Sequence, residues 1–221
     1  MIKAIIFDAG GLLYKRGDAI EALKKDLLVQ FGYQGNYKDF EKAYIKEKFS
    51  GYIQQKSVEE MFKDILSTIG LKLDSYQLLE FIHQFNTIHK KIAPSEYAIS
   101  TLSKLKEMGL KICILTDSFY NEEEKWNWFK RIGMNHLIDI IVTSFDIKKL
   151  KDSKEAYEQC LDKLQLKPEE VIFVGHQQYE MDGAKEAKII SIAIASISEP
   201  NIKADFIVNS LKEVPGFISN L

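Results

Sequence analysis

The chain has 221 residues, of which 46% are hydrophobic and 28% charged, and its formal net charge is −2 at pH 7. These values are ordinary for a globular protein, and the length supports one domain with a large insertion or two small domains. A nearly balanced charge gives no global basic field, so the composition argues against a nucleic-acid partner. No apolar run approaches the ~20 residues that span a membrane, so we expect no membrane partner either.

The N-terminus and the cysteines suggest a compartment. Met1 leads almost directly into a predicted strand, with no signal peptide. Cys113 and Cys160 both lie in apolar periodic segments, which predicts buried free thiols rather than a disulfide. We therefore expect a cytoplasmic protein.

Apolar, strand-like runs alternate with helical patterns along most of the chain. The predicted strands cover residues 3–7, 111–116, 138–143, 170–175, 189–195 and 205–208. Helical periodicity precedes the second of these strands at residues 98–108 and the fourth at residues 156–164. Near-continuous Val and Ile runs separated by helices are typical of a parallel sheet covered on both faces. The sequence thus predicts an α/β fold with a doubly wound parallel sheet.

Residues 15–94 interrupt this alternation. The segment has helical periodicity, many aromatic residues and no convincing strand, and it ends at Pro94. We therefore predict an all-helical domain at residues 15–94, inserted into an α/β core formed by residues 1–14 and 95–221. An insertion directly after the first strand would sit above the carboxyl edge of the sheet, where such folds bind ligands.

The most informative stretch is residues 5–13, where an apolar strand runs into Asp8. Gly10 and Gly11 follow after one alanine. The strand delivers a carboxylate to the carboxyl edge of the sheet, and the glycines allow a substrate to approach the backbone closely. This arrangement predicts that Asp8 is a nucleophile.

Four segments at predicted strand ends together resemble the motifs of the haloacid dehalogenase-like (HAD) hydrolase superfamily, in the branch with a helical cap. They are residues 7–13, residues 115–118, the region of Lys151 ahead of Tyr157, and residues 174–184. The resemblance covers essentially the whole chain in order. It implies a Rossmann-like core with a helical cap, Mg²⁺ as cofactor and a small phosphorylated substrate.

The resemblance also implies a role for each motif residue. Asp8 would attack phosphorus and form an aspartyl intermediate. Thr116 would orient the phosphoryl oxygens, and Lys151 would neutralise charge on them. The remaining residues that the resemblance places at the substrate are Gly10, Gly11 and Ser118.

One departure from the family pattern affects proton transfer. Family phosphatases carry a second Asp two residues after the nucleophile, which protonates the leaving oxygen and then activates water; here that position is Gly10. Loss of a general acid/base typically costs 10²–10⁴-fold in rate. The loss matters least when the leaving group is already a good one.

A second departure affects the metal site, whose implied ligands are Asp8, the Gly10 carbonyl, His176 and Glu180. His176 occupies the place of a metal-binding Asp and offers imidazole nitrogen. Mg²⁺ favours oxygen ligands, whereas nitrogen suits Zn²⁺, Ni²⁺ or Cu²⁺ better. The sequence therefore predicts a weakened Mg²⁺ site, another divalent metal or none.

Three functions remain open at this point. The first is a HAD-type phosphatase that is slow or restricted to good leaving groups, such as acyl or aryl phosphates. The second is a metal-independent 2-haloacid dehalogenase-like hydrolase, whose halide leaves without a proton. The third is a non-catalytic protein that keeps the fold for binding. The substrate, the metal and the oligomeric state are not fixed by the sequence.

Aromatic residues also cluster in residues 126–129, ahead of the third predicted strand. Residues three apart lie on the same side of a helix. We therefore expect Trp126 and Phe129 to be partly buried there.

Overall fold

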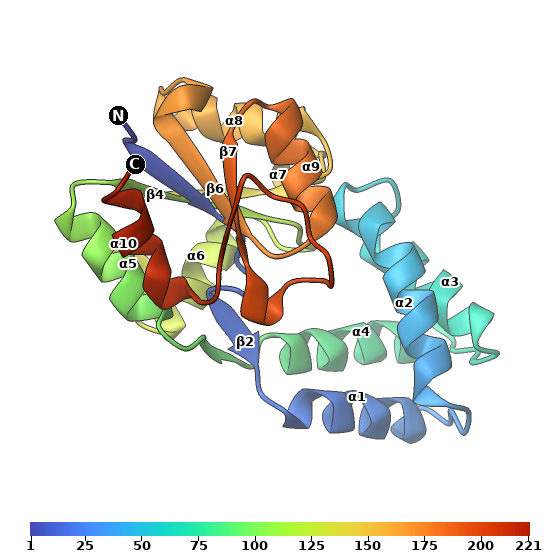
Figure 1. The fold of residues 1–221 in the computed structure, drawn as a ribbon. Coiled ribbons are helices and arrows are strands. Elements are labelled where there is room, and N and C mark those ends of the chain that lie inside the picture. The colour runs from blue at the N-terminus through green and yellow to red at the C-terminus, as the bar shows by residue number, and fades with distance from the viewer. The chain divides into compact units, whose positions relative to one another are not determined.

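A computed structural model describes residues 1–221. The chain forms two compact units, one made of Met1–Lys15 with Ala93–Leu221 and the other of Arg16–Ile92 (Figure 1). The predicted fold class is confirmed, because a parallel sheet with flanking helices is combined with an inserted helical segment. None of the helices has both the length and the apolar character that crossing a membrane requires.

The first unit is built on a six-stranded sheet with strand order β5-β4-β1-β6-β7-β8, in which every neighbouring pair is parallel. Its strands are β1 (Ala4–Phe7), β4 (Lys111–Thr116), β5 (Ile140–Thr143), β6 (Val171–Gly175), β7 (Ile190–Ile194) and β8 (Phe206–Val208). From the central β1 the chain builds β4 and β5 on one side, then returns to build β6, β7 and β8 on the other. This reversal creates a switch point at the carboxyl end of β1, the usual ligand position in such sheets.

Helices cover both faces of this sheet, so its central strands are buried throughout. All four residues of β1 and all five of β6 are buried. One face packs against α8 (Lys154–Leu164) and α9 (Gln178–Glu186), through a core that includes Ile6, Cys113 and Phe173. The other helices of this unit are α5 (Ala98–Glu107), α6 (Glu122–Arg131), α7 (Ser144–Ile147) and α10 (Val214–Ile218). In Figure 1, α5 and α10 lie on the opposite side of the sheet from α8 and α9.

Short 3₁₀ turns complete the first unit. They are η1 (Asn135–Leu137), η2 (Pro168–Glu170), η3 (Ala195–Ile197) and η4 (Leu211–Glu213). Both cysteines of the unit, Cys113 and Cys160, are buried and free, as the sequence predicts.

The strand register sets the level of the residues at the carboxyl edge. Phe7 pairs with Ile114 on one side and Val174 on the other. The amide of Asp8 continues the ladder by donating to the Val174 carbonyl at 3.0 Å. Side chains that follow β1, β4 and β6 therefore reach the same edge of the sheet.

The second unit consists of four helices with well-defined starts. They are α1 (Ala19–Gln30), α2 (Tyr37–Tyr52), α3 (Val58–Thr68) and α4 (Ser75–His89). The Asn36 side chain caps α2, and capping boxes start α3, from Ser57 to Glu60, and α4, from Asp74 to Gln77. Such caps satisfy amides that would otherwise lack partners and are worth about 1 kcal/mol each.

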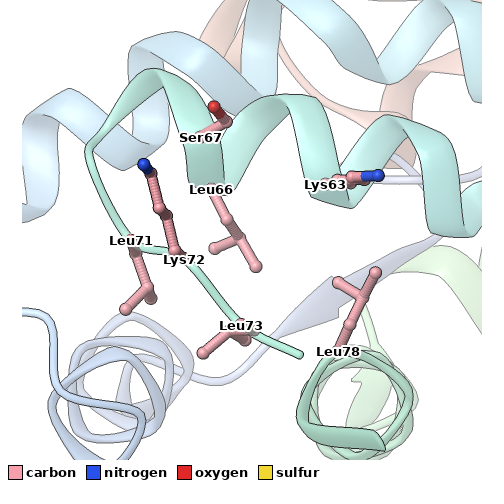
Figure 2. Close-up of a pocket in the computed structure, with 7 residues that line it drawn as sticks. All are labelled: Lys63, Leu66, Ser67, Leu71, Lys72, Leu73 and Leu78. Atoms are coloured by element: carbon pink, nitrogen blue, oxygen red, sulfur yellow. The ribbon is translucent and has the colours of Figure 1, made fainter. Parts of the chain in front are cut away.

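Aromatic side chains form the core of the helical unit. Phe40, Phe62, Phe81 and Phe85 are all buried, and the rings of Phe62 and Phe85 meet edge to face with centroids 4.8 Å apart. The unit also contains a cavity of about 280 Å³. Figure 2 shows its leucines from the end of α3, the following loop and α4, with two lysines at the margin; the lining residues are Lys63, Leu66, Ser67, Leu71, Lys72, Leu73 and Leu78.

Two short strands lie at the ends of the inserted segment, where no strand was predicted. β2 (Tyr14–Arg16) and β3 (Ile92–Pro94) pair in a separate two-stranded sheet. Each has only three residues, too few for an alternating pattern to stand out in a sequence.

The aromatic stretch of α6 is buried along one side of the helix. Trp126 is half-buried and Phe129 is buried, as expected, and Trp128 is buried as well. Lys125, on the same side of the helix as Trp128 and Phe129, is also buried. The buried side of α6 therefore includes two residues, Lys125 and Trp128, that the sequence did not single out.

Gly183 in α9 allows the helix to approach the loop that carries Lys151. A Cβ at this position would collide with the Lys151 carbonyl oxygen and lie 2.8 Å from Cε2 of Tyr157. Because a backbone carbonyl cannot rotate away as a side chain can, we expect Gly183→Ala to lower the free energy of unfolding by about 1–3 kcal/mol in urea denaturation.

The matched control is Gly216→Ala in α10, where a Cβ would meet nothing within 4 Å. This variant is expected to be neutral or to gain up to about 1 kcal/mol, since Ala is the better helix former. Equal stability of the two variants would contradict the close contact at Gly183.

Candidate functional site

A buried ammonium lies between two buried carboxylates at the carboxyl edge of the sheet. Lys151 Nζ is hydrogen-bonded to Asp8 Oδ1 and to Glu180 Oε1, the latter at 2.6 Å. All three residues are at most 3% exposed. Asp8 follows β1, Glu180 lies in the first turn of α9, and Lys151 precedes α8, so three separate segments bring these charges together.

Charge and burial act in opposite directions on these groups. Burial raises the pKa of Asp8 above its usual value, although Lys151 and His176 pull it down. Burial has the largest effect on Glu180 too, but Lys151 and His176 outweigh it and hold the pKa of Glu180 below its usual value. Burial would lower the pKa of Lys151, yet Asp8 and Glu180 raise it well above its usual value. Lys151 is therefore charged at neutral pH, and removing either carboxylate would leave a poorly compensated buried charge.

The second oxygen of Glu180 is used by the backbone. Glu180 Oε2 accepts hydrogen bonds from the amides of His176 at 3.0 Å and Gln177 at 3.2 Å. The Tyr157 hydroxyl donates to the Glu180 carbonyl at 2.6 Å. Glu180 thus holds the start of α9 and the Lys151 ammonium in one arrangement.

The second oxygen of Asp8 has no such partner. Asp8 Oδ2 and His176 Nδ1 are both buried, neither makes a hydrogen bond, and they lie 3.5 Å apart. A buried polar atom without a partner is costly and calls for a functional explanation. Asp8 Oδ2 is accordingly the oxygen of this site that is available to an electrophile or a cation.

Asp8, His176 and Glu180 could hold a metal ion, because one ligand atom from each lies within 4.8 Å of the others. Both Glu180 oxygens are already engaged, however, which leaves one carboxylate oxygen and one imidazole nitrogen beside the Gly10 carbonyl that the resemblance implies. Mg²⁺ prefers an octahedral set of oxygens, so this set fits Mg²⁺ poorly and suits a nitrogen-binding cation better.

The two positions after Ala9 differ in whether their backbone and surroundings require a glycine. Gly11 has φ +86° and a Cβ there would lie 3.3 Å from His176 Nε2, so both backbone and space favour glycine. Gly10 has no positive φ, and a Cβ there would meet only the ring of Tyr14 at ordinary contact distances. The missing side chain at residue 10 is therefore not a requirement of the backbone.

The polar residues after β4 line the neighbouring strand end. Thr116 ends β4 and is buried. Ser118 is also buried; its amide donates to Ser144 Oγ at 3.0 Å, and its hydroxyl oxygen accepts from the Tyr120 amide at 3.0 Å. These bonds order the loop that follows β4 beside the Asp8 edge.

Sequence reasoning passed over Asp117, which belongs to the same cluster. Its Oδ1 accepts from the Lys151 amide at 3.3 Å, and its Oδ2 accepts from the Tyr179 hydroxyl at 3.1 Å. Burial raises the pKa of Asp117 to about 6. Its place directly after Thr116 in the second motif was the available signal, but nothing in the sequence shows that it anchors the Lys151 backbone.

Comparison with known proteins gives a consistent picture. A family model described as haloacid dehalogenase-like hydrolase matches residues 5–194. The glyceraldehyde 3-phosphate phosphatase of Methanocaldococcus jannaschii is 27% identical, over 100% of this chain and 99% of that protein. Pyrophosphatase PpaX of Bacillus mycoides is 25% identical, over 72% of this chain and 81% of that protein.

Solved structures share the same fold. The L-2-haloacid dehalogenase of Xanthobacter autotrophicus superposes with a TM-score of 0.75 at 18% identity, covering 100% of both chains. A protein described as a predicted phosphoglycolate phosphatase from Haemophilus somnus gives 0.75 at 16% identity, covering 98% of both. At these identities the likeness concerns the fold alone.

The raised pKa of Asp117 makes stability depend on pH. Between about pH 4 and 6 the folded protein keeps a proton on Asp117 that the unfolded chain has lost, so unfolding becomes easier as the pH rises. The difference between about 6 and 3.8 corresponds to roughly 3 kcal/mol. Asp117 keeps some exposed surface, so we expect Asp117→Asn to gain only about 1–2 kcal/mol at pH 7 and nothing near pH 4.

Urea denaturation at pH 4, 5, 6 and 7 measures this difference. Asp26→Asn, which alters an exposed carboxylate of α1, controls for the loss of one negative charge. A gain for Asp117→Asn that is the same at pH 4 and pH 7 would rule out the proton linkage.

Proposed function

Because the chain belongs to the haloacid dehalogenase-like hydrolase family, we propose that it hydrolyses small phosphorylated compounds through an aspartyl intermediate on Asp8. One observation carries this proposal: one oxygen of the buried Asp8 is held by Lys151 while the other has no hydrogen-bond partner. A fixed carboxylate with one free oxygen beside a cation is suited to nucleophilic attack on an anionic substrate.

The proposed reaction has two steps. Asp8 Oδ2 attacks phosphorus, the bond from phosphorus to the leaving oxygen breaks, and water then hydrolyses the aspartyl phosphate. Lys151 offsets negative charge on Asp8 and on the phosphoryl group, while Thr116 orients the phosphoryl oxygens from the end of β4. Glu180 and Asp117 act as positioning residues, because they hold the Lys151 ammonium and its backbone.

The relatives support phosphorylated small molecules as the substrate class, since two of them are named as a glyceraldehyde 3-phosphate phosphatase and a pyrophosphatase. Gly10 restricts the choice further, because it supplies no carboxylate to protonate the leaving oxygen. Acyl and aryl phosphates, whose leaving groups need little protonation, are the substrates that this site favours.

The donor set also sets an expectation for metals. Asp8 Oδ2 and His176 Nδ1 are the two unpartnered ligand atoms of the site. We propose that Mg²⁺ binds this site more weakly than Co²⁺ or Ni²⁺, since these ions accept imidazole nitrogen more readily. Titration of each ion into protein treated with EDTA measures the order.

A metal-independent haloacid hydrolase is the second candidate. It is favoured by Gly10 and by the Lys151 cation, because halide departs as an anion and needs no proton. Attack by Asp8 Oδ2 on carbon would form an ester in place of an aspartyl phosphate. Assay of 2-chloropropionate beside the phosphates separates the two candidates.

Replacement of the nucleophile tests the proposal. With acetyl phosphate and p-nitrophenyl phosphate as substrates, Asp8→Asn is expected to lower kcat by at least about 10³-fold, because the amide cannot form the intermediate. Asp182→Asn is the matched control, since Asp182 is an exposed carboxylate of α9 outside the site. Phosphate release measures both.

Two outcomes would contradict the proposal. Turnover that survives Asp8→Asn would show that another group attacks phosphorus. A wild-type protein with no turnover of any phosphate or haloacid would favour the non-catalytic binding function.

A further inference from the structure

The space beside Gly10 is filled by the phenol of Tyr14. A Cβ on Gly10 would lie 3.8 Å from the Tyr14 hydroxyl oxygen. Two backbone hydrogen bonds fix Tyr14 there: its amide donates to the Ala9 carbonyl at 3.2 Å, and the Gly11 amide donates to the Tyr14 carbonyl at 2.8 Å. The hydroxyl thus lies next to the space that a side chain on residue 10, two residues after the nucleophile, would enter.

A buried lysine binds this hydroxyl. Lys125 Nζ donates to the Tyr14 hydroxyl oxygen at 2.9 Å, and both residues are 2% exposed. The ammonium also lies 4.2 Å from the ring centroid of Trp128, 5.4 Å from that of Tyr14 and 5.8 Å from that of Tyr120. Cation–π attraction of this kind is strongest when the cation is removed from water.

The direction of this hydrogen bond leaves a proton available. A lysine ammonium has only donors, so the Tyr14 oxygen must be the acceptor. The phenolic proton of Tyr14 then points elsewhere, and the structure gives it no acceptor within the protein. The phenol thus offers a donor beside residue 10, and Lys125 Nζ lies 2.9 Å from the oxygen that would carry the negative charge after proton transfer.

We propose that Tyr14 is the catalytic acid and base of this site, supported by Lys125, in place of the carboxylate that Gly10 lacks. The proposal rests on the proposed phosphatase function. It extends the substrate class from acyl phosphates and activated aryl phosphates to phenyl and alkyl phosphates, whose leaving groups are poor.

The proton balance closes over the two steps. As Asp8 Oδ2 bonds to phosphorus and the bond to the leaving oxygen breaks, the Tyr14 hydroxyl transfers its proton to that oxygen and becomes a phenolate beside Lys125. When water attacks the aspartyl phosphate, the phenolate takes a proton from the water. The bond between Asp8 and phosphorus then breaks, and both Asp8 and Tyr14 return to their starting states.

A leaving-group series tests this role. The substrates are acetyl phosphate, p-nitrophenyl phosphate, phenyl phosphate and glycerol 3-phosphate, in order of increasing need for a proton. Tyr14→Phe is expected to lower kcat for the last two by about 10²-fold or more and to change the first two by less than about threefold, because only poor leaving groups need the acid. Lys125→Met is expected to act in the same direction.

A rescue variant separates catalysis from packing. The backbone at Gly10 has no positive φ, so Gly10→Asp can be tolerated there. In the Tyr14→Phe background, Gly10→Asp is expected to raise kcat on phenyl phosphate by at least about tenfold, because a carboxylate at that position can transfer the proton. Tyr97→Phe, which removes an exposed phenol elsewhere in the same unit, is the control.

The outcomes distinguish this inference from the proposed function. If turnover requires Asp8 but Tyr14→Phe lowers it equally for all four substrates, or does not lower it, the proposed role of Tyr14 is overturned. The proposed phosphatase function is not affected by that result. Failure of Gly10→Asp to rescue, with the thermal midpoint of Tyr14→Phe lowered, assigns Tyr14 to packing. Absence of wild-type turnover on every substrate overturns both proposals.

Discussion

The contact of Lys151 with Asp8 and Glu180 is the interaction on which the rest of the site depends. An ammonium can be buried here only because two carboxylates meet it, and the ammonium in turn lowers the pKa of both carboxylates against the effect of burial. Their meeting depends in turn on the fold: β1 delivers Asp8, the first turn of α9 delivers Glu180, and Gly183 lets α9 approach the Lys151 backbone. A change in any of these packing contacts therefore reaches Asp8, the proposed nucleophile.

The site separates the positioning of charge from the transfer of protons. Lys151, Glu180 and Asp117 form a closed set of buried contacts that leaves one oxygen of Asp8 free. For proton transfer we propose the Tyr14 hydroxyl in place of a carboxylate, because it lies beside residue 10 and binds Lys125. The charge cluster contains Asp8 and the proposed acid is Tyr14. Both residues adjoin the turn after β1, so the geometry of that turn affects both.

Much of the fold and the identity of the central residues could be predicted from the sequence. The core strands are near-continuous runs of Val and Ile, and motif spacing singled out Asp8, Lys151 and Glu180, which lie in direct contact. The short strands β2 and β3 could not be predicted, because three residues carry no period. Burial of Lys125 could not be predicted either, since one of the rings around its ammonium, that of Tyr14, comes from a distant part of the chain.

The insertion of the helical unit between β1 and its sheet partner β4 has a consequence for the order of folding. Pairing β1 with β4 must close a loop that includes all of Arg16–Ile92, and the entropic penalty of closure grows with the length of flexible chain. The helices α2, α3 and α4 carry their own caps and share an aromatic core, so this segment can gain structure from local contacts. Once it has done so, the pairing of β2 with β3 brings its two ends together, and the loop that β1 and β4 must close becomes short. Folding of the helical unit first would thus lower the entropic penalty of assembling the sheet.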